Sequence, residues 1–228
     1  VLHDKCFEDC ENLATLIFNP KTTTIEPHSF DKCNKLRTLE FDSTTTTIPL
    51  LNYSFLSNIS TIIIPTSVTY IEQDAFKNCS SLEHIVIPPS VRSLMPKTFD
   101  SCTNLTKLTI DVYQTKFDLS TFAKCTRLSH LCFYDGINFL PEFDYKLLPT
   151  ITTITIPNSV TSIGWRAFAQ CRKLEKIIIP NSVVSIDSDA FHSCLNLKSI
   201  TIPSSVKSLG GGIFFHCDKL TKVIIPPS

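Results

Sequence analysis

Residues 151–194 read ITTITIPNSVTSIGWRAFAQCRKLEKIIIPNSVVSIDSDAFHSC, and one pattern occurs twice within them. The segment Ala167–Cys171 returns as Ala190–Cys194, and it occurs earlier as Ala75–Cys79. Stepping through the whole chain by this interval meets an aromatic side chain every time, at Phe7, Phe30, Tyr53, Phe76, Phe99, Phe122, Tyr145, Phe168, Phe191 and Phe214. A fixed period of about 23 residues, without insertions, is typical of a repeat protein.

A second column of the repeat holds a cysteine three residues after the aromatic, and leucine takes the same place twice. The column reads Cys10, Cys33, Leu56, Cys79, Cys102, Cys125, Leu148, Cys171, Cys194 and Cys217. Further apolar columns follow at fixed distances, so that one unit reads F-x-x-C-x-x-L-x-x-I-x-I-P-x-S-V-x-x-I-x-x-x-A. Most units therefore offer the same apolar side chains at the same places along the chain.

The unit divides into three short segments with different local preferences. The L-x-x-I-x-I segment ends in the alternation typical of a strand with one buried face. Proline then ends the strand, because it has no N–H to donate to a neighbouring strand. These prolines are Pro65, Pro88, Pro157, Pro180, Pro203 and Pro226. We expect S-V-x-x-I to form a second extended segment and A-F-x-x-C to form a short helical or 3-10 turn. One such coil cannot bury its apolar side alone, so we expect stacked coils with parallel strands about 4.8 Å apart.

The complete pattern resembles the BspA-like class of leucine-rich repeats, and the resemblance covers essentially the whole chain. It implies an α/β, β-rich repeat solenoid, a right-handed curved leucine-rich-repeat horseshoe with a parallel concave sheet and short helical or 3-10 turns on the convex side. We expect residues 1–228 to form a single solenoid of about ten repeats, and a chain that opens without Met to be a fragment of a longer chain or a mature product. Solenoids normally shield their terminal coils. We therefore expect flanking sequence, a fusion or an end-to-end, homo-oligomeric contact to cover the last coil near Pro226–Ser228.

The resemblance also implies a non-catalytic module that binds macromolecules, in some members host matrix proteins, often on microbial or protist cell surfaces. We therefore expect a protein-binding or adhesion role, at a cell surface or after secretion, with a protein such as a host or matrix protein as partner. The alternative is an intracellular structural scaffold in the cytoplasm that docks to a larger protein assembly. The sequons at Asn52, Asn58, Asn78 and Asn104 favour the first role only if the chain enters a secretory pathway.

Charge and composition argue against several other classes of protein. The chain has 21 basic and 21 acidic side chains, and this balance argues against a nucleic-acid binder, which normally has a clustered basic excess. Hydrophobic residues make up 43% of the chain, so intrinsic disorder is not expected. No apolar run approaches the ~18 residues of a membrane-spanning helix, and no signal peptide is visible at Val1. We expect no membrane span.

The cysteine column predicts a reduced, buried ladder, because a position that accepts Leu56 and Leu148 is an apolar core position. A disulfide framework fits less well, since side chains that point in parallel make the required S–S torsion awkward. A zinc site also fits less well, since C-x₂-C pairs are absent. We expect neither a metal nor a cofactor. Cys132 falls outside the column on the solvent side of a strand, so we expect it to be the most reactive thiol. The structural core ladder includes Phe76, Cys79, Phe99, Cys102, Phe168, Cys171, Phe191 and Cys194.

The sequence offers no catalytic constellation. His84 and His130 share one strand column two repeats apart, with Lys107 between them. A separation of about 10 Å is too large for one metal ion or a proton relay, so we expect solvated surface histidines. Neither G-x-S-x-G nor H-E-x-x-H occurs, and Gly210–Gly212 lacks the Lys-Ser/Thr of a phosphate-binding loop. We therefore expect a protein that is not an enzyme.

Strand positions that point away from the core form two columns on the expected concave face. The first column reads Thr15, Thr38, Thr61, His84, Lys107, His130, Thr153, Lys176, Ser199 and Lys222. The second column reads Ile17, Glu40, Ile63, Val86, Thr109, Cys132, Thr155, Ile178, Thr201 and Ile224. Exposed apolar rows of this extent mark a candidate interaction surface. The alternative is that β-branched residues stand there simply because they favour strands.

The repeat is least regular between Asp111 and Pro149, where specificity can change without cost to the core. Tyr113 and Tyr134 stand at the expected strand exits, and Asp135 with the following glycine introduces a turn. Tyrosine is a favoured anchor in binding sites, although these aromatics could equally cover an irregular core. The candidate ligand-binding residues, on the concave face and the strand-exit loops, are Tyr113, Tyr134, His84, Lys107, His130, Thr153, Lys176 and Asp135.

Overall fold

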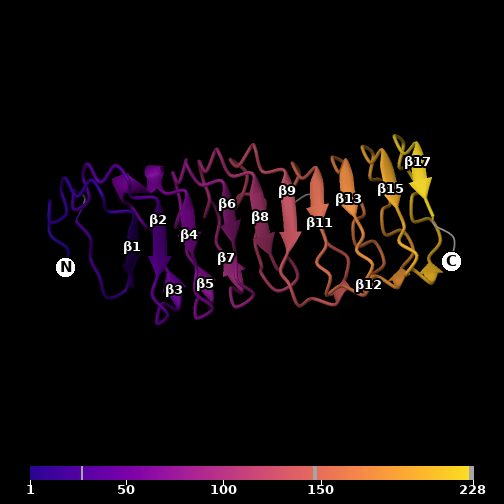
Figure 1. Cartoon of the computed structure of the whole chain (residues 1–228), viewed down its shortest axis with the longest axis horizontal. Coiled ribbons are helices and arrows are strands. Elements are labelled where there is room, and N and C mark those ends of the chain that lie inside the picture. The colour runs from indigo at the N-terminus through magenta and orange to yellow at the C-terminus, as the bar shows by residue number, and fades with distance from the viewer. Residues whose placement is uncertain (27, 146–147, 226–228) are drawn as a thin grey trace. The chain divides into compact units, whose positions relative to one another are not determined.

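In the computed structural model, the described residues are 1–26, 28–145 and 148–225. They belong to two compact units, Val1–Leu128 and Ser129–Ser228. Within each unit the chain winds in successive coils, and equivalent strands lie side by side (Figure 1). Pro226, which we expected to end the last strand, lies outside the described residues.

The first unit contains two rows of parallel strands. The longer strands are β1 (Thr15–Phe18), β2 (Thr38–Phe41), β4 (Thr61–Ile63), β6 (His84–Val86) and β8 (Lys107–Ile110). Hydrogen bonds join β1, β2 and β4 in one parallel ladder and β6 with β8 in another. The two-residue strands are β3 (Thr47–Ile48), β5 (Tyr70–Ile71) and β7 (Ser93–Leu94), which pair in the order β3-β5-β7.

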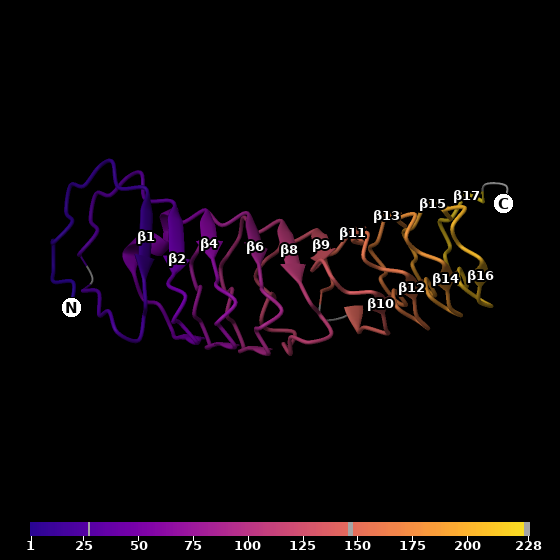
Figure 2. The ribbon, with the colours of Figure 1, turned by 60° about the horizontal axis from the view of Figure 1, so that its bottom comes forward.

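The second unit repeats the same arrangement. Its longer strands are β9 (His130–Phe133), β11 (Thr153–Thr155), β13 (Lys176–Ile178), β15 (Ser199–Thr201) and β17 (Lys222–Ile224). Its two-residue strands are β10 (Phe139–Leu140), β12 (Ser162–Ile163), β14 (Ser185–Ile186) and β16 (Ser208–Leu209). Figure 2 shows these two rows of the second unit as separate lines of strands. In both rows the paired residues are one repeat apart, as in Ile154↔Ile177 and Ile163↔Ile186.

These coils make the chain a parallel β-solenoid of about nine turns with almost no helix. The ten aromatic positions from Phe7 to Phe214 enclose nine equal intervals, which accounts for that number. The predicted strand and the predicted second extended segment are both confirmed. The described part of the chain contains no helix that is long and apolar enough to cross a membrane.

The segment that returns the chain differs from the helical or 3-10 turn that we expected. It is a 3-10 helix at η1 (Ser54–Asn58), whereas the coils of Phe76 and Phe168 return through non-helical turns. In these turns the backbone N–H of Phe76 donates to the Thr98 carbonyl at 2.9 Å, and that of Phe168 donates to the Ala190 carbonyl at 2.8 Å. The turn therefore forms a third hydrogen-bonded ladder between neighbouring coils.

Left-handed backbone conformations shape the same turns. Residues two before and two after the aromatic have positive φ, as at Asp74 (58°) and Asn78 (66°), and at Arg166 (53°) and Gln170 (61°). A left-handed conformation costs an L-residue roughly 1–2 kcal/mol, because Cβ approaches the following carbonyl oxygen. The hydrogen bonds of the turn ladder offset this cost, so side chains of many kinds occupy positions where glycine would be expected.

The apolar side chains of the repeat fill the interior of each unit. Phe76, Phe99, Phe168 and Phe191 have no exposed surface. The ring centroids of Phe76 and Phe99 are 5.5 Å apart, and those of Phe168 and Phe191 are 5.2 Å apart. These separations fall within the roughly 4.5–7 Å at which aromatic pairs attract each other. One coil therefore buries the ring face that its neighbour presents.

The strained turns lead to a first prediction. Replacing Lys97, whose φ is 59°, with glycine should relieve the left-handed strain and raise the free energy of unfolding by about 0.5–1 kcal/mol. Lys77 is also an exposed lysine of a turn, but it does not have a positive φ, so Lys77→Gly should lower stability by a similar amount. Urea unfolding followed by circular dichroism compares the two variants. A loss of stability in Lys97→Gly would show that the turn carries no such strain.

Candidate binding surface

Most cysteines of the column lie in the interior of their unit, and several of their thiols are hydrogen-bonded. The thiol of Cys102 donates to the Phe76 carbonyl at 3.2 Å, and that of Cys194 donates to the Phe168 carbonyl at 3.3 Å. Each bond runs to the aromatic residue of the preceding coil. Leucine keeps the apolar volume at this position but lacks the donor, so the thiol adds a polar link between coils that leucine cannot make.

Burial raises the pKa of several interior thiols of the ladder and so keeps them protonated. It raises the pKa of Cys171 to about 12 and raises the pKa of Cys125 further above its usual range. A thiol that stays neutral is a poor nucleophile and a poor metal ligand. The ladder therefore has a structural role, and all ten cysteines are free.

Exposure of the cysteines outside the interior differs from our expectation. Cys132 in β9 is half-buried, whereas Cys6 and Cys10 in the first coil are exposed. Sequence reasoning placed Cys10 in the buried column because it treated the first coil like the others. The first coil has a neighbour on only one side within the described residues, so its column positions remain open to solvent.

Thiol labelling provides a second prediction. A thiol reagent added to the native chain should react first with Cys6 and Cys10, and more slowly with the half-buried Cys132 and Cys217. The buried thiols should react only when the chain unfolds; they are Cys33, Cys79, Cys102, Cys125, Cys171 and Cys194. Mass spectrometry of peptides after timed labelling assigns each site. Rapid labelling of Cys102 or Cys171 under native conditions would contradict a closed core.

The histidines of the strand column have separate environments. The Nε2 atom of His84 lies 3.0 Å from the Thr109 hydroxyl, and burial, followed by the charge of Lys107, lowers the pKa of His84. His130 lies in the second unit, where its Nδ1 atom is 2.9 Å from the Ser129 hydroxyl. Within the described residues, no group of three His, Cys, Asp or Glu side chains could hold a metal ion. We find no acid, base and nucleophile placed together at these histidines.

The two tyrosines chosen from the sequence belong to different units of the chain. Tyr113 belongs to the first unit and is mostly buried, and this burial, together with Asp111, raises the pKa of its hydroxyl group. Its backbone N–H donates to the Asp111 carboxylate at 3.0 Å, which fixes the turn after β8. Tyr134 and Asp135 belong to the second unit, where the Gly136 N–H donates to the Asp135 carboxylate at 3.0 Å. Both acidic residues therefore shape turns, and Tyr113 contributes to packing.

An aromatic patch lies near the irregular repeat and contains Trp165 and Phe139. Trp165 is 51% exposed, and the Arg166 guanidinium lies 5.2 Å from the centre of its ring. The ring of Phe139 lies against Gly164, where an added Cβ would come within 2.5 Å of its Cζ atom. Glycine therefore lets the Phe139 ring lie across the next coil, and the patch is a packed feature of the second unit.

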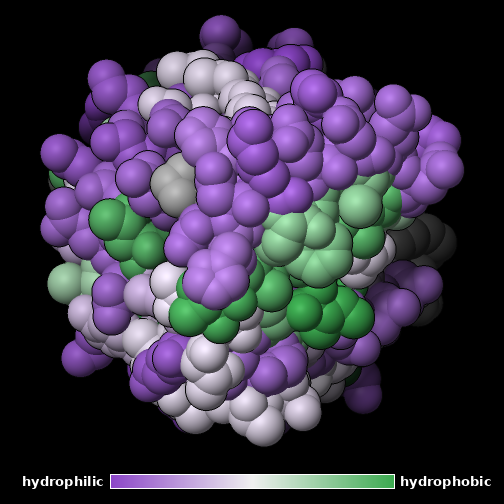
Figure 3. All heavy atoms as spheres, turned by 90° about the vertical axis from the view of Figure 1, so that its left-hand side faces the viewer, coloured by the Kyte–Doolittle hydropathy of each residue, from purple (hydrophilic) through white to green (hydrophobic). Residues whose placement is uncertain are grey.

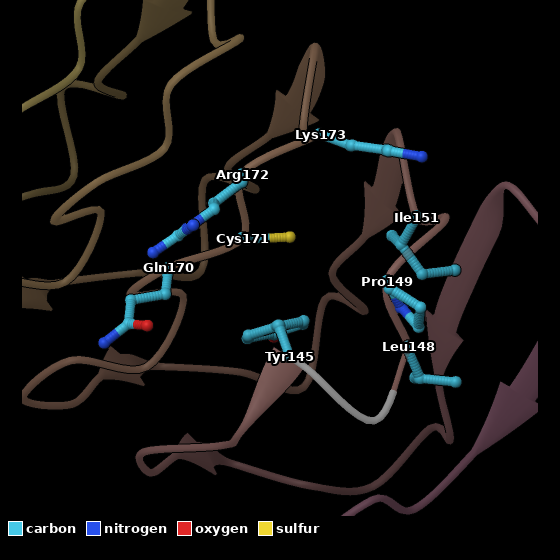
Figure 4. A pocket seen from close by; sticks show the side chains of 8 residues that line it. All are labelled: Tyr145, Leu148, Pro149, Ile151, Gln170, Cys171, Arg172 and Lys173. Atoms are coloured by element: carbon cyan, nitrogen blue, oxygen red, sulfur yellow. The ribbon is translucent and has the colours of Figure 1, made fainter. Parts of the chain in front are cut away.

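The second unit also has a pocket of about 250 Å³. Figure 4 shows the side chains around it, among them Tyr145 and Cys171. The side chains that line it are Tyr145, Leu148, Pro149, Ile151, Gln170, Cys171, Arg172 and Lys173. Residues 146–147, which follow Tyr145 directly, lie outside the described residues. We therefore assign no ligand to this pocket.

The long-strand face, formed by the outward side chains of the longer strands, exposes aliphatic groups in both units. In the first unit Ile17 is 58% exposed, Ile63 is 44% exposed and Val86 is 38% exposed. In the second unit Ile178 is 64% exposed and Ile224 is 41% exposed. Inward neighbours such as Ile62 and Ile177 are buried, so the alternation predicted from the sequence is present. Of the candidate residues, Lys107, His84, His130, Thr153 and Lys176 all lie on this face.

A groove of about 430 Å³ opens on the long-strand face of the second unit. One hydrogen-bonded ladder ends at β13 and another begins at β15, and the groove lies between these two strands. Its lining combines Lys176, Ile178, Asn181, Ser199, Thr201 and Ser204 with the backbone and buried residues beneath them. The repeat pattern is regular on both sides of this break, so nothing in the sequence indicated it.

Apolar side chains also reach the surface at the first and last described coils. Figure 3 shows hydrophobic side chains gathered at the end that carries the first coil, with hydrophilic ones around them. Val1 there is 71% exposed, and in the last coil Val223 and Ile225 are 40% and 65% exposed. A cover for the last coil by flanking sequence, a fusion or a second copy stays a prediction.

The family model described as "BspA type Leucine rich repeat region" matches residues 1–106, 51–146 and 140–228. The chain therefore belongs to the BspA-type leucine-rich repeat family, which is generally non-catalytic. The resemblance that the repeat pattern suggested is confirmed.

Several solved structures of bacterial proteins are similar to this chain. A leucine-rich repeat protein from Bacteroides ovatus is 25% identical, with a TM-score of 0.50 over 96% of this chain and 57% of that one. A leucine rich cell surface protein from Faecalibacterium prausnitzii is 22% identical, with a TM-score of 0.38 over 99% of this chain and 69% of that one. An internalin from Listeria monocytogenes is 13% identical, with a TM-score of 0.34 over 96% of this chain and 88% of that one.

These likenesses concern the fold of the chain. The chain spans little more than half the length of the Bacteroides ovatus protein. None of the curated proteins matches this chain.

Proposed function

We propose that this chain is a non-catalytic protein-recognition module that serves adhesion or ligand binding at a cell surface or after secretion. The observation that carries the proposal is the row of exposed aliphatic side chains on the long-strand face. Ile17 and Ile178 each expose more than half of their surface there, although buried positions one residue away show that the strands have an interior side. Binding a partner would remove these groups from water.

The rigidity of the long-strand face supports the same role. The β1-β2-β4 and β9-β11-β13 ladders fix the backbone beneath it, and equivalent side chains point the same way in successive coils. A preordered surface loses little conformational freedom when a partner binds. A face of this kind can therefore recognise an extended or flat protein surface without rearranging.

Membership of a generally non-catalytic family also supports the proposal. The setting at a cell surface or after secretion follows what the BspA-like resemblance implies for repeats of this kind.

A third prediction tests the long-strand face directly. Ile178→Glu should weaken binding of the labelled chain to a coat of extracellular matrix proteins by roughly tenfold, because a charge would replace a desolvated aliphatic contact. Fluorescence of the retained chain at increasing concentration measures the affinity.

Val184→Glu is the matched control, because Val184 is an aliphatic residue of the same unit, 43% exposed, that lies outside the longer strands. This variant should bind the coat like the parent chain. Equal weakening by both variants would point to non-specific adhesion, and unchanged binding by Ile178→Glu would remove the long-strand face as the binding surface.

A further inference from the structure

The long-strand face of the second unit carries charge of only one sign. The outward residue at the start of each longer strand is His130, Thr153, Lys176, Ser199 or Lys222. The outward residue two positions later is Cys132, Thr155, Ile178, Thr201 or Ile224. Neither column contains a carboxylate, whereas Glu40 lies in the corresponding column of the first unit. A polar, basic row therefore runs beside an aliphatic and threonine row.

The two lysines of the basic row have no carboxylate partner among the described residues. On the rim of the same unit, the Lys198 ammonium lies 4.0 Å from the Glu175 carboxylate. Among the described residues, no carboxylate lies within 4.0 Å of the Lys176 or Lys222 ammonium. Both side chains are exposed, so both charges are available to an incoming anion.

The spacing of these lysines matches an extended polypeptide. Lys176 and Lys222 are two coils apart, which corresponds to about 9.6 Å at the separation of hydrogen-bonded strands, and the interrupted ladder between β13 and β15 makes this a lower bound. A polyproline II segment rises about 3.1 Å per residue, so residues three positions apart are separated by about 9.3 Å. Such a segment has three residues per turn, so these residues also lie on the same side. Acidic side chains at every third position would therefore meet both lysines at once.

The groove between β13 and β15 lies between the two lysines. Ile178 and Thr201 belong to its lining, as do Asn181 and Ser204 at the strand exits. The aliphatic part of the groove suits an apolar side chain on the neighbouring edge of the same segment. The amide of Asn181 and the hydroxyl of Ser204 can exchange hydrogen bonds with the backbone of the segment.

We infer that the long-strand face of the second unit binds an extended acidic peptide segment that crosses the strands, with acidic side chains at every third residue and an apolar residue in the groove between β13 and β15. The inference rests on the proposed function, because it names the partner chemistry for part of the same face. Lys176 and Lys222 hold the carboxylates, and Ile178 contacts the apolar residue. The attraction acts between exposed charges and falls as salt is added.

The experiment uses the full chain and a fluorescent, terminally blocked peptide that repeats the tripeptide Glu-Pro-Leu. Proline favours the polyproline II conformation, which places all glutamates on one edge and all leucines on another. Two control peptides repeat Gln-Pro-Leu, or have the acidic composition in an order that breaks the three-residue spacing. Fluorescence anisotropy at low and high salt should show that the regular acidic peptide binds at least roughly tenfold more tightly than either control, with an affinity that salt weakens.

Charge reversal on the chain tests the two lysines. The double variant Lys176→Glu, Lys222→Glu should lose the preference for the acidic peptide, with an affinity that falls at least roughly tenfold. The matched control reverses Arg172 and Lys207, which are exposed, lie outside the longer strands and cause the same change of net charge. It should bind like the parent chain. Circular dichroism confirms that both variants retain the strand spectrum.

Three results would overturn the inference. These are equal affinity for the three peptides, equal weakening by both double variants, and equally tight binding of a single-stranded oligonucleotide through the same lysines. Equal affinity for the three peptides would show that apolar contacts alone hold them. Equal weakening by both double variants would show that only the net charge of the chain matters. Equally tight binding of the oligonucleotide would show a general site for anionic polymers. If the acidic peptide does not bind but Ile178→Glu still weakens matrix binding, the inference fails and the proposed function stands. If the acidic peptide binds but Ile178→Glu leaves binding to the matrix coat unchanged, the inference about the peptide site stands and the proposed adhesion role fails.

Discussion

Each coil of this chain is held to its neighbour by contacts between residues one repeat, or nearly one repeat, apart. The strand ladders pair Leu16 with Leu39 and Ile154 with Ile177, and the ring stack joins Phe168 to Phe191. The thiol of Cys194 then links its own coil to the carbonyl group of Phe168. A single coil has no neighbour to cover its apolar side, so the stability of a coil belongs largely to its interfaces. The insertion or deletion of one residue within a repeat would shift all of these contacts together.

The same constraint separates the residues that build the fold from those that are free to vary. Inward strand positions such as Ile177 and Ile200 meet the next coil and must stay apolar. Outward positions on the same strands meet only solvent and like-placed neighbours, so Thr153, Lys176 and Ser199 can succeed one another without disturbing the ladder. The outward residues of the long-strand face can therefore vary to suit a partner, because substitutions there leave the packing of the core unchanged.

Sequence reasoning succeeded where one residue type has one physical role. The period of the aromatic column, the alternation before the proline and the acceptance of leucine at the cysteine position were enough to predict both rows of strands. The shape of the returning turn could not be predicted, because its left-handed positions hold Asp74, Lys97 or Gln170 instead of glycine. Such residues do not indicate a positive φ, and the hydrogen bonds to the next coil that support it come from residues of many kinds. The turn therefore followed from the stacking of coils and not from local preference.

The sequence predicted some residues of the candidate binding surface better than others. The outward columns were read correctly from the alternation, and with them the place of His84, Lys107 and Lys176. The irregular segment was a weaker guide, since its Tyr113 is mostly buried and serves packing beside the Asp111 turn. A departure from the repeat shows only that the usual core contacts have changed, and the new residues must first replace those contacts. A regular strand has its core contacts already satisfied on the inward side, so its outward side chains remain available to a partner. For this reason we expect the regular strands, more than the irregular repeat, to carry the specificity of this chain.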